Sequence, residues 1–425
     1  MKHMQEKDEK LILHPFSPYR SNKHNINITH GKGALLYDET GRAYIDAIGS
    51  WWVNLHGHAH PYINKHITEQ MTRLEHVIFA GFTHAPAVNL AERLLNQLGS
   101  PYSQLFYSDN GSTAVEVALK MSIQYWANRG EKRHTFIALK NSYHGDTFGA
   151  MSVSERDVFT EAFHQHLFKV NYIDIPTEEN IHSCETQLEE IIEKEAVAAF
   201  IFEPLVQGAG GMRLYASPLL DRLIDICQKH HVLTIADEVM TGFYRTGTMF
   251  AINQIRNKPD FIILSKGLTG GYFPLGVTAY PDFIAKSFQS TEPSHIFYHG
   301  HSFTANPLSC TAALASLDLL LLPETKECIQ KIEAKHLLFL GSIKDHPRIS
   351  NARQKGVILA FDVNIPHHGY FYNHPIKDIV YDLMIKQGIL MRPLGNVLYI
   401  LPPYCIKEQE LDQVYNAIIH TLSQI

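Results

Sequence analysis

Three short apolar runs in the middle of the sequence each end in side chains that could do chemistry. They are Val197–Phe202 before Glu203, residues 232–236 before Asp237 and Glu238, and Phe261–Leu264 before Ser265 and Lys266. Each run is short, almost continuously apolar and rich in branched or aromatic residues, which is typical of a strand buried on both faces. Ligands of open α/β sheets bind beyond the carboxyl ends of the strands. The three runs therefore predict one ligand site at one edge of a sheet.

Asp237 and Lys266 are the most specific pair at this predicted site. A carboxylate at a buried strand end needs a partner, because burying it unpaired costs several kcal/mol. A structural arginine or lysine is the ordinary partner. The alternative is a protonated pyridine nitrogen, which the aspartate would keep cationic and able to take up carbanion electrons. A lysine usually extends to the surface, but one that is desolvated over a ring cofactor has the lowered pKa that a Schiff-base nucleophile needs.

A glycine turn at residues 110–116 precedes a predicted helix and could bind a phosphate. Gly111 allows close backbone approach, and the free N–H groups at the start of a helix attract anions. Thr113-x-x-Glu116 also matches a capping box. Taken alone, the pattern favours an ordinary capped helix over a phosphate site. The apolar positions at helical spacing are Val115, Ala118, Leu119, Ile123 and Trp126.

The rhythm of the sequence predicts an α/β fold with two domains. From about residue 100 to 280, short apolar runs alternate with helical patterns, which indicates a mainly parallel sheet with crossover helices. The two ends differ, with hairpin-like strands near residues 34–37, later amphipathic helices, and a strand near 398–401 that two prolines stop. We expect a large domain of residues 50–320 and a smaller α/β domain assembled from residues 1–49 and 321–425.

The composition excludes several classes of protein. The 425 residues are 45% hydrophobic, and a formal net charge of −6 is spread along the chain, so we expect neither nucleic acid nor an anionic membrane as partner. No stretch approaches the ~20 apolar residues of a membrane span, and residues 1–10 fit neither a signal nor a transit peptide. Five scattered cysteines without a C-x-x-C motif favour a reducing cytoplasm.

The spacing His56-x-His58-x-His60 invites a metal site. On a strand the three rings would share one side, but Gly57 and Pro61 favour a turn, and no further metal motif accompanies them. We interpret the stretch as a polar loop and expect no metal.

Several motifs together resemble the class III aminotransferases. Residues 237–247 (DEVMTGFYRTG) with 265–267 (SKG) match that family's signature. The paired tryptophans and the long motif that begins at Tyr143 resemble one branch more narrowly, which transfers an amino group to 8-amino-7-oxononanoate in biotin biosynthesis. The resemblance implies a fold type I transferase with pyridoxal 5′-phosphate and a seven-stranded, mainly parallel sheet in the large domain. The other supporting motifs are 50–52 (SWW), 84–86 (HAP), 143–152 (YHGDTFGAMS), 206–212 (VQGAGGM), 306–308 (NPL), 392–393 (RP) and 401–404 (LPPY).

The resemblance also implies roles for single residues. At the cofactor, Gly111 and Ser112 would hold the phosphate, and Tyr143 would stack on the ring. Asp237 would pair with the ring nitrogen, and Lys266 would be the catalytic Schiff-base lysine and proton carrier. Ser302 would reach the phosphate from a neighbouring subunit, which implies a homodimer. The residues implied at the small-molecule substrates are Trp51, Trp52, Tyr143, Asp146, Arg245, Lys266, Arg392 and Tyr399.

Arg392 and the aromatic residues have ordinary alternatives. The resemblance gives Arg392 the carboxylate of the acceptor, which suits a guanidinium fork, but a surface ion pair is the alternative. Trp51, Trp52 and Tyr399 would line the apolar part of the pocket, although buried aromatic residues usually belong to a core.

Two positions depart from the adenosylmethionine-using form of this branch. Phe16 stands where a tyrosine would lie beside the donor, and His301-Ser302 replaces a Pro-Thr pair, as in the lysine-using form. A serine can still donate its hydroxyl to a phosphate. We expect S-adenosylmethionine as the amino donor, with lysine as the alternative.

Three other functions compete with this one. An aminotransferase for 4-aminobutyrate or ornithine would need a pocket for a short carboxylate rather than one walled by two tryptophans. A racemase or decarboxylase on the same fold would bind the cofactor without accumulating its aminated form. A binding protein without chemistry would have no need of Lys266 and Asp237. A dinucleotide-binding dehydrogenase is disfavoured, because no G-x-G-x-x-G follows a predicted strand.

Overall fold

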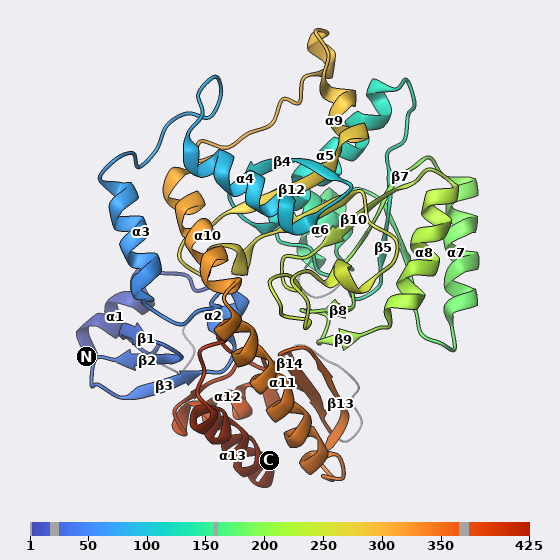
Figure 1. The fold of residues 1–425 in the computed structure, drawn as a ribbon. Coiled ribbons are helices and arrows are strands. Elements are labelled where there is room, and N and C mark those ends of the chain that lie inside the picture. The colour runs from blue at the N-terminus through green and yellow to red at the C-terminus, as the bar shows by residue number, and fades with distance from the viewer. Residues whose placement is uncertain (1, 18–24, 157–159, 365–373) are drawn as a thin grey trace.

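A seven-stranded sheet forms the centre of the molecule (Figure 1). The computed structural model describes residues 2–17, 25–156, 160–364 and 374–425. The strand order is β4-β12-β11-β10-β7-β5-β6, and each neighbouring pair is parallel except the two that involve β12. The predicted α/β class with a mainly parallel seven-stranded sheet is confirmed. The strands are β4 (Tyr102–Ser108), β5 (Thr135–Leu139), β6 (Val170–Ile173), β7 (Val197–Phe202), β10 (Leu233–Asp237), β11 (Phe261–Leu264) and β12 (Gly276–Pro281).

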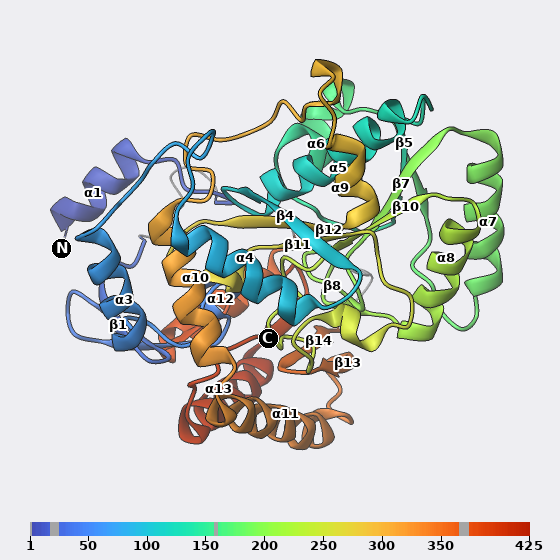
Figure 2. The same cartoon turned by 45° about the horizontal axis from the view of Figure 1, so that its top comes forward.

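Alternate residues along the strands face opposite sides of this sheet and bury two separate cores. On β5, Phe136 and Ala138 belong to one core, whereas Ile137 and Leu139 belong to the other. A strand in this position must be apolar throughout, which explains the continuous apolar runs in the sequence. The first face is covered by α5 (Gly111–Asn128), α6 (Phe148–Val153) and α9 (Asp282–Phe288), and the second by α4 (Ala85–Leu98), α7 (Ile181–Lys194), α8 (Ser217–Lys229) and α10 (Pro307–Leu320) (Figure 2).

The three runs predicted as strands lie side by side as β7, β10 and β11. β7 and β11 have the predicted bounds, and β10 begins and ends one residue later than predicted. Its end is later because Asp237 still pairs with Ile263 in the ladder. On the other side of β10, Ala236 pairs with Phe202. Since the strands are parallel and in register, the residues that follow them leave the sheet at the same edge.

Strands from the two ends of the chain share a second sheet, of order β1-β2-β3-β15. β15 comes from near the C-terminus and pairs parallel with β3. The three-stranded sheet β13-β14-β16 and three helices lie close by, in the lower part of Figure 1. The expected division at residues 49/50 and 320/321 stays a proposal, which this shared sheet supports. The elements are β1 (Ile28–Lys32), β2 (Leu35–Asp38), β3 (Ala43–Asp46), β13 (Ile349–Lys355), β14 (Ile358–Val363), β15 (Ile389–Leu390), β16 (Val397–Ile400), α11 (Pro323–Ile343), α12 (Ile376–Lys386) and α13 (Glu408–Gln424).

Short elements connect these layers. A two-stranded ribbon, β8 (Val206–Gln207) with β9 (Arg213–Leu214), follows β7. The remaining α-helices are α1 (Lys2–Leu11) and α3 (Pro61–Met71), whereas the segment labelled α2 (Gly49–Trp52) is a turn of positive φ angles. Short 3₁₀ segments occur at Glu161–His166, Ala251–Gln254, Lys266–Thr269 and Pro293–His295.

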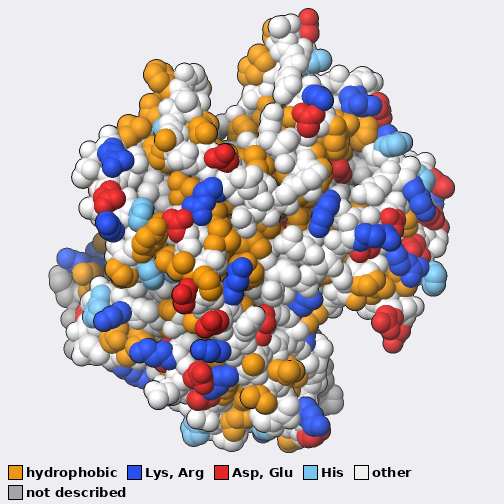
Figure 3. Space-filling view, viewed as in Figure 1, with side chains coloured by type: hydrophobic (Ala, Val, Ile, Leu, Met, Phe, Trp, Pro, Cys, Tyr) orange, Lys and Arg blue, Asp and Glu red, His pale blue; other side chains and the backbone are white. Residues whose placement is uncertain are grey.

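The surface mixes charges of both signs. On the face shown in Figure 3, basic and acidic side chains are interspersed rather than gathered by sign. Over the described ranges no single helix is long and apolar enough to cross a membrane, although the bent pair α10 and α11 passes that test by length and composition.

Candidate active site

A cavity of about 470 Å³ lies beyond the carboxyl ends of β7, β10 and β11. It brings together Glu203, Asp237 and Lys266, the residues that follow or end these strands. Its other predicted residues come from the loop after β5, from the start of α5 and from α2. The predicted residues that line the cavity are Trp52, Gly111, Ser112, Tyr143, Asp237 and Lys266.

Lys266 begins the 3₁₀ turn that follows β11, with a positive φ of 46°. Its Nζ atom lies 4.8 Å from the centre of the Trp52 ring. Burial lowers the pKa of the Lys266 amine, while the Asp237 and Glu203 carboxylates oppose that shift. A lysine with a lowered pKa is more often neutral near pH 7, and the neutral amine is the nucleophile.

Asp237 is buried and pairs with a histidine. Its Oδ1 accepts from the N–H of Val239 at 3.0 Å, and its Oδ2 lies 2.7 Å from Nδ1 of His144. In the described parts of the chain, no lysine or arginine forms a salt bridge with Asp237. Sequence reasoning gave His144 no role, although it lies in the motif of Tyr143. Among the described residues the carboxylate therefore has a histidine but no structural arginine or lysine as partner, which suits a protonated ring nitrogen in the cavity.

The start of α5 has the features of a phosphate site. Asn110 caps the helix, since its Oδ1 accepts from the N–H of Thr113 at 3.0 Å, and the first two residues of α5, Gly111 and Ser112, line the cavity. A Cβ atom at Gly145 would lie 2.0 Å from Oγ of Ser112. The loop therefore approaches the helix more closely than any side chain at residue 145 would allow, which suits a tight anion cradle.

Two details of α5 differ from the prediction. The capping box is formed by Asn110 and Thr113 rather than by Thr113 and Glu116. Glu116 instead accepts hydrogen bonds from Oγ1 of Thr147 at 2.6 Å and from the N–H of Gly149 at 2.7 Å, so it ties α5 to α6. Ile123 is 40% exposed rather than buried.

Tyr143 and Glu203 form the wall of the cavity next to Asp237. The N–H of Tyr143 donates to Oε1 of Glu203 at 3.1 Å, and the N–H of Gly208 donates to Oε2 at 2.9 Å. Burial raises the pKa of Glu203 to about 7. Burial and the neighbouring Asp146 carboxylate raise the pKa of the Tyr143 hydroxyl, which keeps its proton. Asp146 itself is exposed at the edge of the site.

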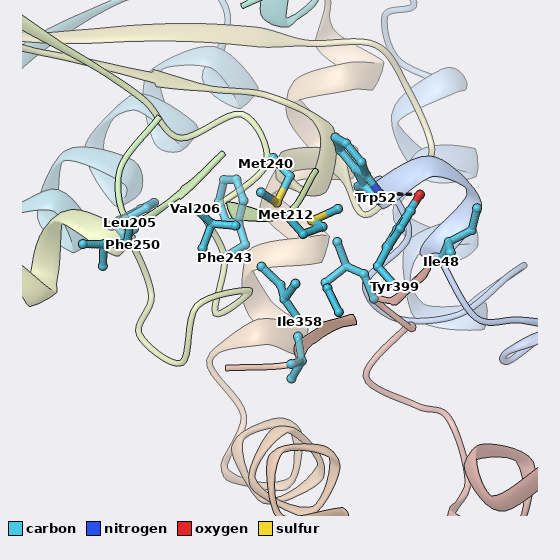
Figure 4. Close-up of a cluster of buried hydrophobic side chains, with 14 of the residues drawn as sticks. Ile48, Trp52, Leu205, Val206, Met212, Met240, Phe243, Phe250, Ile358 and Tyr399 are labelled. Carbon is cyan, nitrogen blue, oxygen red and sulfur yellow. Dashed lines mark hydrogen bonds between the residues drawn. The ribbon is translucent and has the colours of Figure 1, made fainter. Parts of the chain in front are cut away.

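Trp52 and Tyr399 belong to a buried apolar cluster (Figure 4). Nε1 of Trp52 donates to the Tyr399 hydroxyl at 3.1 Å, and the two rings meet edge to face. Met212 and Met240 lie beside them in the same view. Trp52 is part of the cavity wall, whereas Tyr399 supports it from behind.

Trp51, Phe16 and Arg392 form a second aromatic and cationic group. The Arg392 guanidinium carbon lies 4.9 Å from the centre of the Trp51 ring, and Nη2 donates to the Phe16 carbonyl at 2.8 Å. The Phe16 and Trp51 rings meet edge to face at 5.5 Å. None of the three lines the cavity itself.

Arg245 and Ser302 also lie away from the cavity wall. Arg245 is buried, and its guanidinium donates to the carbonyls of Pro402 at 2.9 Å, Asn54 at 3.0 Å and Trp52 at 3.2 Å. These contacts favour an indirect role, through the backbone of Trp52, over the predicted substrate contact. Ser302 is exposed, and its reach into a neighbouring subunit stays a prediction.

The histidines at 56, 58 and 60 do not converge on one point. Nε2 of His56 lies 3.0 Å from Oγ of Ser316, and Nε2 of His58 lies 3.0 Å from Oδ2 of Asp46. Within the described residues, no group of three or more histidine, cysteine, aspartate or glutamate side chains could hold a metal ion.

Comparison with known proteins agrees with this geometry. A family model described as aminotransferase class-III matches residues 17–422. The chain belongs to this family. Among related class-III aminotransferases, the adenosylmethionine-8-amino-7-oxononanoate aminotransferase of Synechococcus elongatus is 47% identical over 419 residues, which cover 97% of this chain and 98% of that protein. The enzyme of that name from Helicobacter pylori is 35% identical over 435 residues, with 98% and 97% covered.

Solved structures of class-III aminotransferases have the same fold. The adenosylmethionine-8-amino-7-oxononanoate aminotransferase of Methanocaldococcus jannaschii superposes with a TM-score of 0.94 at 34% identity, covering 100% of this chain and 99% of that one. An amine transaminase from an uncultivated Pseudomonas species, in its PLP-bound form, gives a TM-score of 0.91 at 30% identity and covers 97% and 98%. The predicted family is therefore confirmed.

Proposed function

We propose that this chain binds pyridoxal 5′-phosphate and transfers an amino group to 8-amino-7-oxononanoate, which yields 7,8-diaminononanoate. The observation that carries the proposal is the convergence of Lys266 and Asp237 in one cavity, where the lysine pKa is lowered and the aspartate pairs with a histidine but, among the described residues, with no arginine or lysine. The names of the full-length relatives support the acceptor.

The cavity residues fit this cofactor one by one. When bound, pyridoxal phosphate supplies an aldehyde carbon that bonds to amines and a cationic ring that takes up electrons. Asp237 would hold the ring nitrogen, and Tyr143 would fix the plane of the ring. The first N–H groups of α5, with Ser112, would hold the phosphate. Oγ of Ser112 accepts from the N–H of Asp146 at 3.3 Å, and its hydroxyl hydrogen would donate to the phosphate.

Lys266 is the group that would bond to the aldehyde and then act as acid and base. Once a substrate amine has taken its place, the free Lys266 amine would accept the proton from the substrate carbon and would deliver it to the carbon that had been the aldehyde carbon of the cofactor. The burial of the Lys266 amine and the facing Trp52 ring would keep water away from this proton. In the second half of the reaction Lys266 would move a proton in the opposite direction.

The acceptor pocket would be built around the tryptophans. Trp52 lines the cavity and Tyr399 supports it, which gives an apolar wall for a long alkyl chain. Arg392 lies over Trp51, and its Nη2 donates to the Phe16 carbonyl. The other N–H groups of its guanidinium would bind the carboxylate at the far end of the alkyl chain. Asp146 would act at the edge of the same pocket, and Arg245 would act indirectly, through its hydrogen bond to the Trp52 carbonyl.

S-adenosylmethionine is the proposed amino donor, with lysine as the alternative. Whole-chain similarity to enzymes named for adenosylmethionine supports the first. The apolar Phe16 ring beside Trp51 keeps the second open.

The working unit would be a homodimer in the cytoplasm. Large apolar side chains stay exposed in the single chain, among them Phe82 (63%), Tyr298 (71%) and Phe303 (61%). Exposed apolar residues of this size commonly mark an interface. Ser302 is next to Phe303 and would complete the phosphate site of the other subunit. All five cysteines are free, which suits a reducing compartment.

The visible absorbance of purified, cofactor-loaded protein tests this function. Adenosylmethionine or lysine is added separately, followed by 8-amino-7-oxononanoate. We expect one donor to bleach the band of the lysine-linked cofactor and the acceptor to restore it. Bleaching by ornithine or 4-aminobutyrate instead would retain the family and overturn the acceptor, and bleaching that no acceptor reverses would favour a different reaction on the same fold.

A further inference from the structure

Four consecutive residues before the cavity adopt a left-handed backbone. The φ angles of Gly49, Ser50, Trp51 and Trp52 are 55°, 46°, 68° and 75°. Residues with a side chain rarely adopt this conformation, and tryptophan has no local means of stabilising it. The surrounding structure must therefore hold the turn. Because both tryptophans lie in it, whatever holds the turn also aims their rings.

Asp46 is the centre of the contacts that hold this turn. The residue is fully buried at the end of β3. Its Oδ1 accepts from the N–H of Ser50 at 2.9 Å and from the N–H of Ile48 at 3.3 Å, and its Oδ2 accepts from the Ser50 hydroxyl at 2.8 Å. His58 is its only salt-bridge partner among the described residues. A buried carboxylate with this many donors is rigid, since losing any one of them is costly.

His58 completes this group of contacts and is fixed in one tautomer. Asn54 accepts from the N–H of Gly57 at 2.7 Å with Oδ1, so its amide nitrogen, 3.2 Å from Nδ1 of His58, is the donor there. Nδ1 must then accept, and the proton sits on Nε2, which donates to Oδ2 of Asp46 at 3.0 Å.

The backbone of His58 is itself attached to the N-terminal hairpin. Its N–H donates to the carbonyl of Gly33 at 2.8 Å, and the N–H of Gly33 donates back at 3.3 Å. A Cβ atom at Gly31 would lie 2.6 Å from Cβ of His58, so the strand β1 packs directly against it. His58 therefore links the hairpin, through its backbone, to Asp46, through its imidazole.

We propose that Asp46, Ser50 and His58 are positioning residues for the acceptor pocket. They hold the left-handed turn that sets Trp52 over Lys266 and Trp51 under Arg392. None of the three lines the cavity, so they act through the two tryptophans. The link to the acceptor rests on the proposed function, whereas the positioning of the rings does not.

Tryptophan fluorescence tests the positioning without any turnover. The chain has three tryptophans, and Trp126 lies apart from the pocket in α5, where it donates to the carbonyl of Ala198 and stacks under Arg133. In a Trp126→Phe background, the emission therefore comes from Trp51 and Trp52 alone. His58→Leu fills the same space without the N–H donor, and His58→Gln can replace it with an amide N–H.

We expect His58→Leu to move the emission to longer wavelength and to increase its quenching by acrylamide, and His58→Gln to restore both. Ser50→Ala removes only the hydroxyl contact and should give a smaller change in the same direction. Because Ser50→Ala is the milder change, this variant still tests the proposal if His58→Leu does not fold. Unchanged emission in folded His58→Leu and Ser50→Ala would overturn the proposal, and so would a His58→Gln variant that behaves like His58→Leu.

His336→Leu is the matched control. His336 is more deeply buried than His58 and also has two partners, the Tyr415 hydroxyl at 2.7 Å and the Val357 carbonyl at 3.1 Å, but it lies in α11. The His336→Leu variant should be less stable, and its tryptophan emission should not change. If its emission changed as much as that of His58→Leu, a general loss of stability rather than the positioning contacts would explain the effect.

Kinetics then tests the link to the acceptor. A distorted apolar pocket should raise KM for 8-amino-7-oxononanoate about tenfold in His58→Leu, with a smaller effect on kcat. A purely structural role predicts a lower active fraction with unchanged KM. If the wild-type protein does not use this acceptor, the proposed function fails, and the fluorescence result still decides the positioning.

Discussion

Nδ1 of His144 lies 2.7 Å from Oδ2 of Asp237, and both side chains are almost completely buried. The ring is fixed by this contact, while its Nε2 atom has no partner in the described structure. The carboxylate is held from the other side by the N–H of Val239. The orientation of the Asp237 carboxylate at the cavity is therefore already fixed, which suits its proposed contact with the ring nitrogen of the cofactor.

His144→Leu should weaken cofactor binding. A hydrogen bond to a charged group is worth about 1.5–3 kcal/mol, or about one to two powers of ten in the dissociation constant. His144→Asn keeps a donor near the position of Nδ1 and should recover part of the loss. The measurement is an absorbance titration of cofactor-free protein with pyridoxal phosphate. Equal affinity in His144→Leu and the wild type would show that Asp237 needs no help from the histidine.

Lys266→Ala should keep the cofactor and lose both its visible lysine-linked band and turnover, because only this amine can bond to the aldehyde in the cavity. Lys258→Ala is a suitable control, since burial also lowers the pKa of Lys258, whose amine donates to the carbonyl of Ile252 instead of facing the cavity. It should keep the band. Turnover at the wild-type rate in Lys266→Ala would remove the basis of the proposed function.

Glu203 should make the cofactor-free protein less stable as the pH rises from about 5 to 7. Burial raises its pKa from 4.5 to about 7, so in this range the folded state binds a proton that the unfolded state has lost. The free energy of unfolding then falls with pH. Glu203→Gln removes this titration, and its stability relative to the wild type should grow across the same range by at most about 3 kcal/mol.

Urea unfolding at pH 5 and pH 8 measures this difference. Glu185→Gln is a control that should not change with pH in this range: Arg222 lowers the pKa of Glu185 from 4.5, so the stability that this carboxylate contributes is already almost fully present at pH 5. A Glu203→Gln variant whose advantage does not change with pH would contradict the raised pKa.

The parts of this structure that sequence predicts well are those fixed by burial along one stretch of chain. β7 and β11 have the predicted bounds because a strand covered on both faces must be apolar at every position. β10 runs one residue further because ladder pairing continues through the polar Asp237. Asp237 and Lys266 were predicted together because parallel strands in register bring their ends to one edge.

The parts that sequence did not predict depend on contacts between distant segments. His144 and Asp237 are 93 positions apart in the sequence, and Tyr143 and Glu203 are 60 positions apart. No local sequence pattern predicts either contact. The capping prediction at Glu116 failed for the same reason, since its carboxylate binds the start of α6. The left-handed turn at Ser50 contradicts local preference altogether, and only the buried Asp46 contacts explain it.

Gly145→Ala should impair cofactor binding through the phosphate cradle. The added Cβ would lie 2.0 Å from Oγ of Ser112, and the φ of 130° is one that alanine rarely adopts. The loop and the start of α5 would have to separate, which should raise the cofactor dissociation constant about tenfold or more. Gly130→Ala is the control, because it also has a positive φ, of 78°, but open space around it.

Gly130→Ala should cost about 1 kcal/mol of stability and leave cofactor binding unchanged. Calorimetry for stability and absorbance titration for the cofactor separate the two effects. Equal cofactor affinity in both variants would mean that the close approach at Gly145 is not needed for the phosphate.

Arg392→Ala should weaken the acceptor more than the donor. The guanidinium is held between the Trp51 ring and the Phe16 carbonyl, and it would bind the acceptor carboxylate with the N–H groups that remain. Losing a charged pair of hydrogen bonds costs about 1.5–3 kcal/mol, so KM for 8-amino-7-oxononanoate should rise about 10- to 100-fold. Arg392→Lys keeps the charge without the planar fork and should recover only part of this loss. Single-turnover rates of the donor half-reaction, measured on the same variants, should change much less, and equal losses in the two half-reactions would assign Arg392 to the fold of the pocket rather than to the carboxylate.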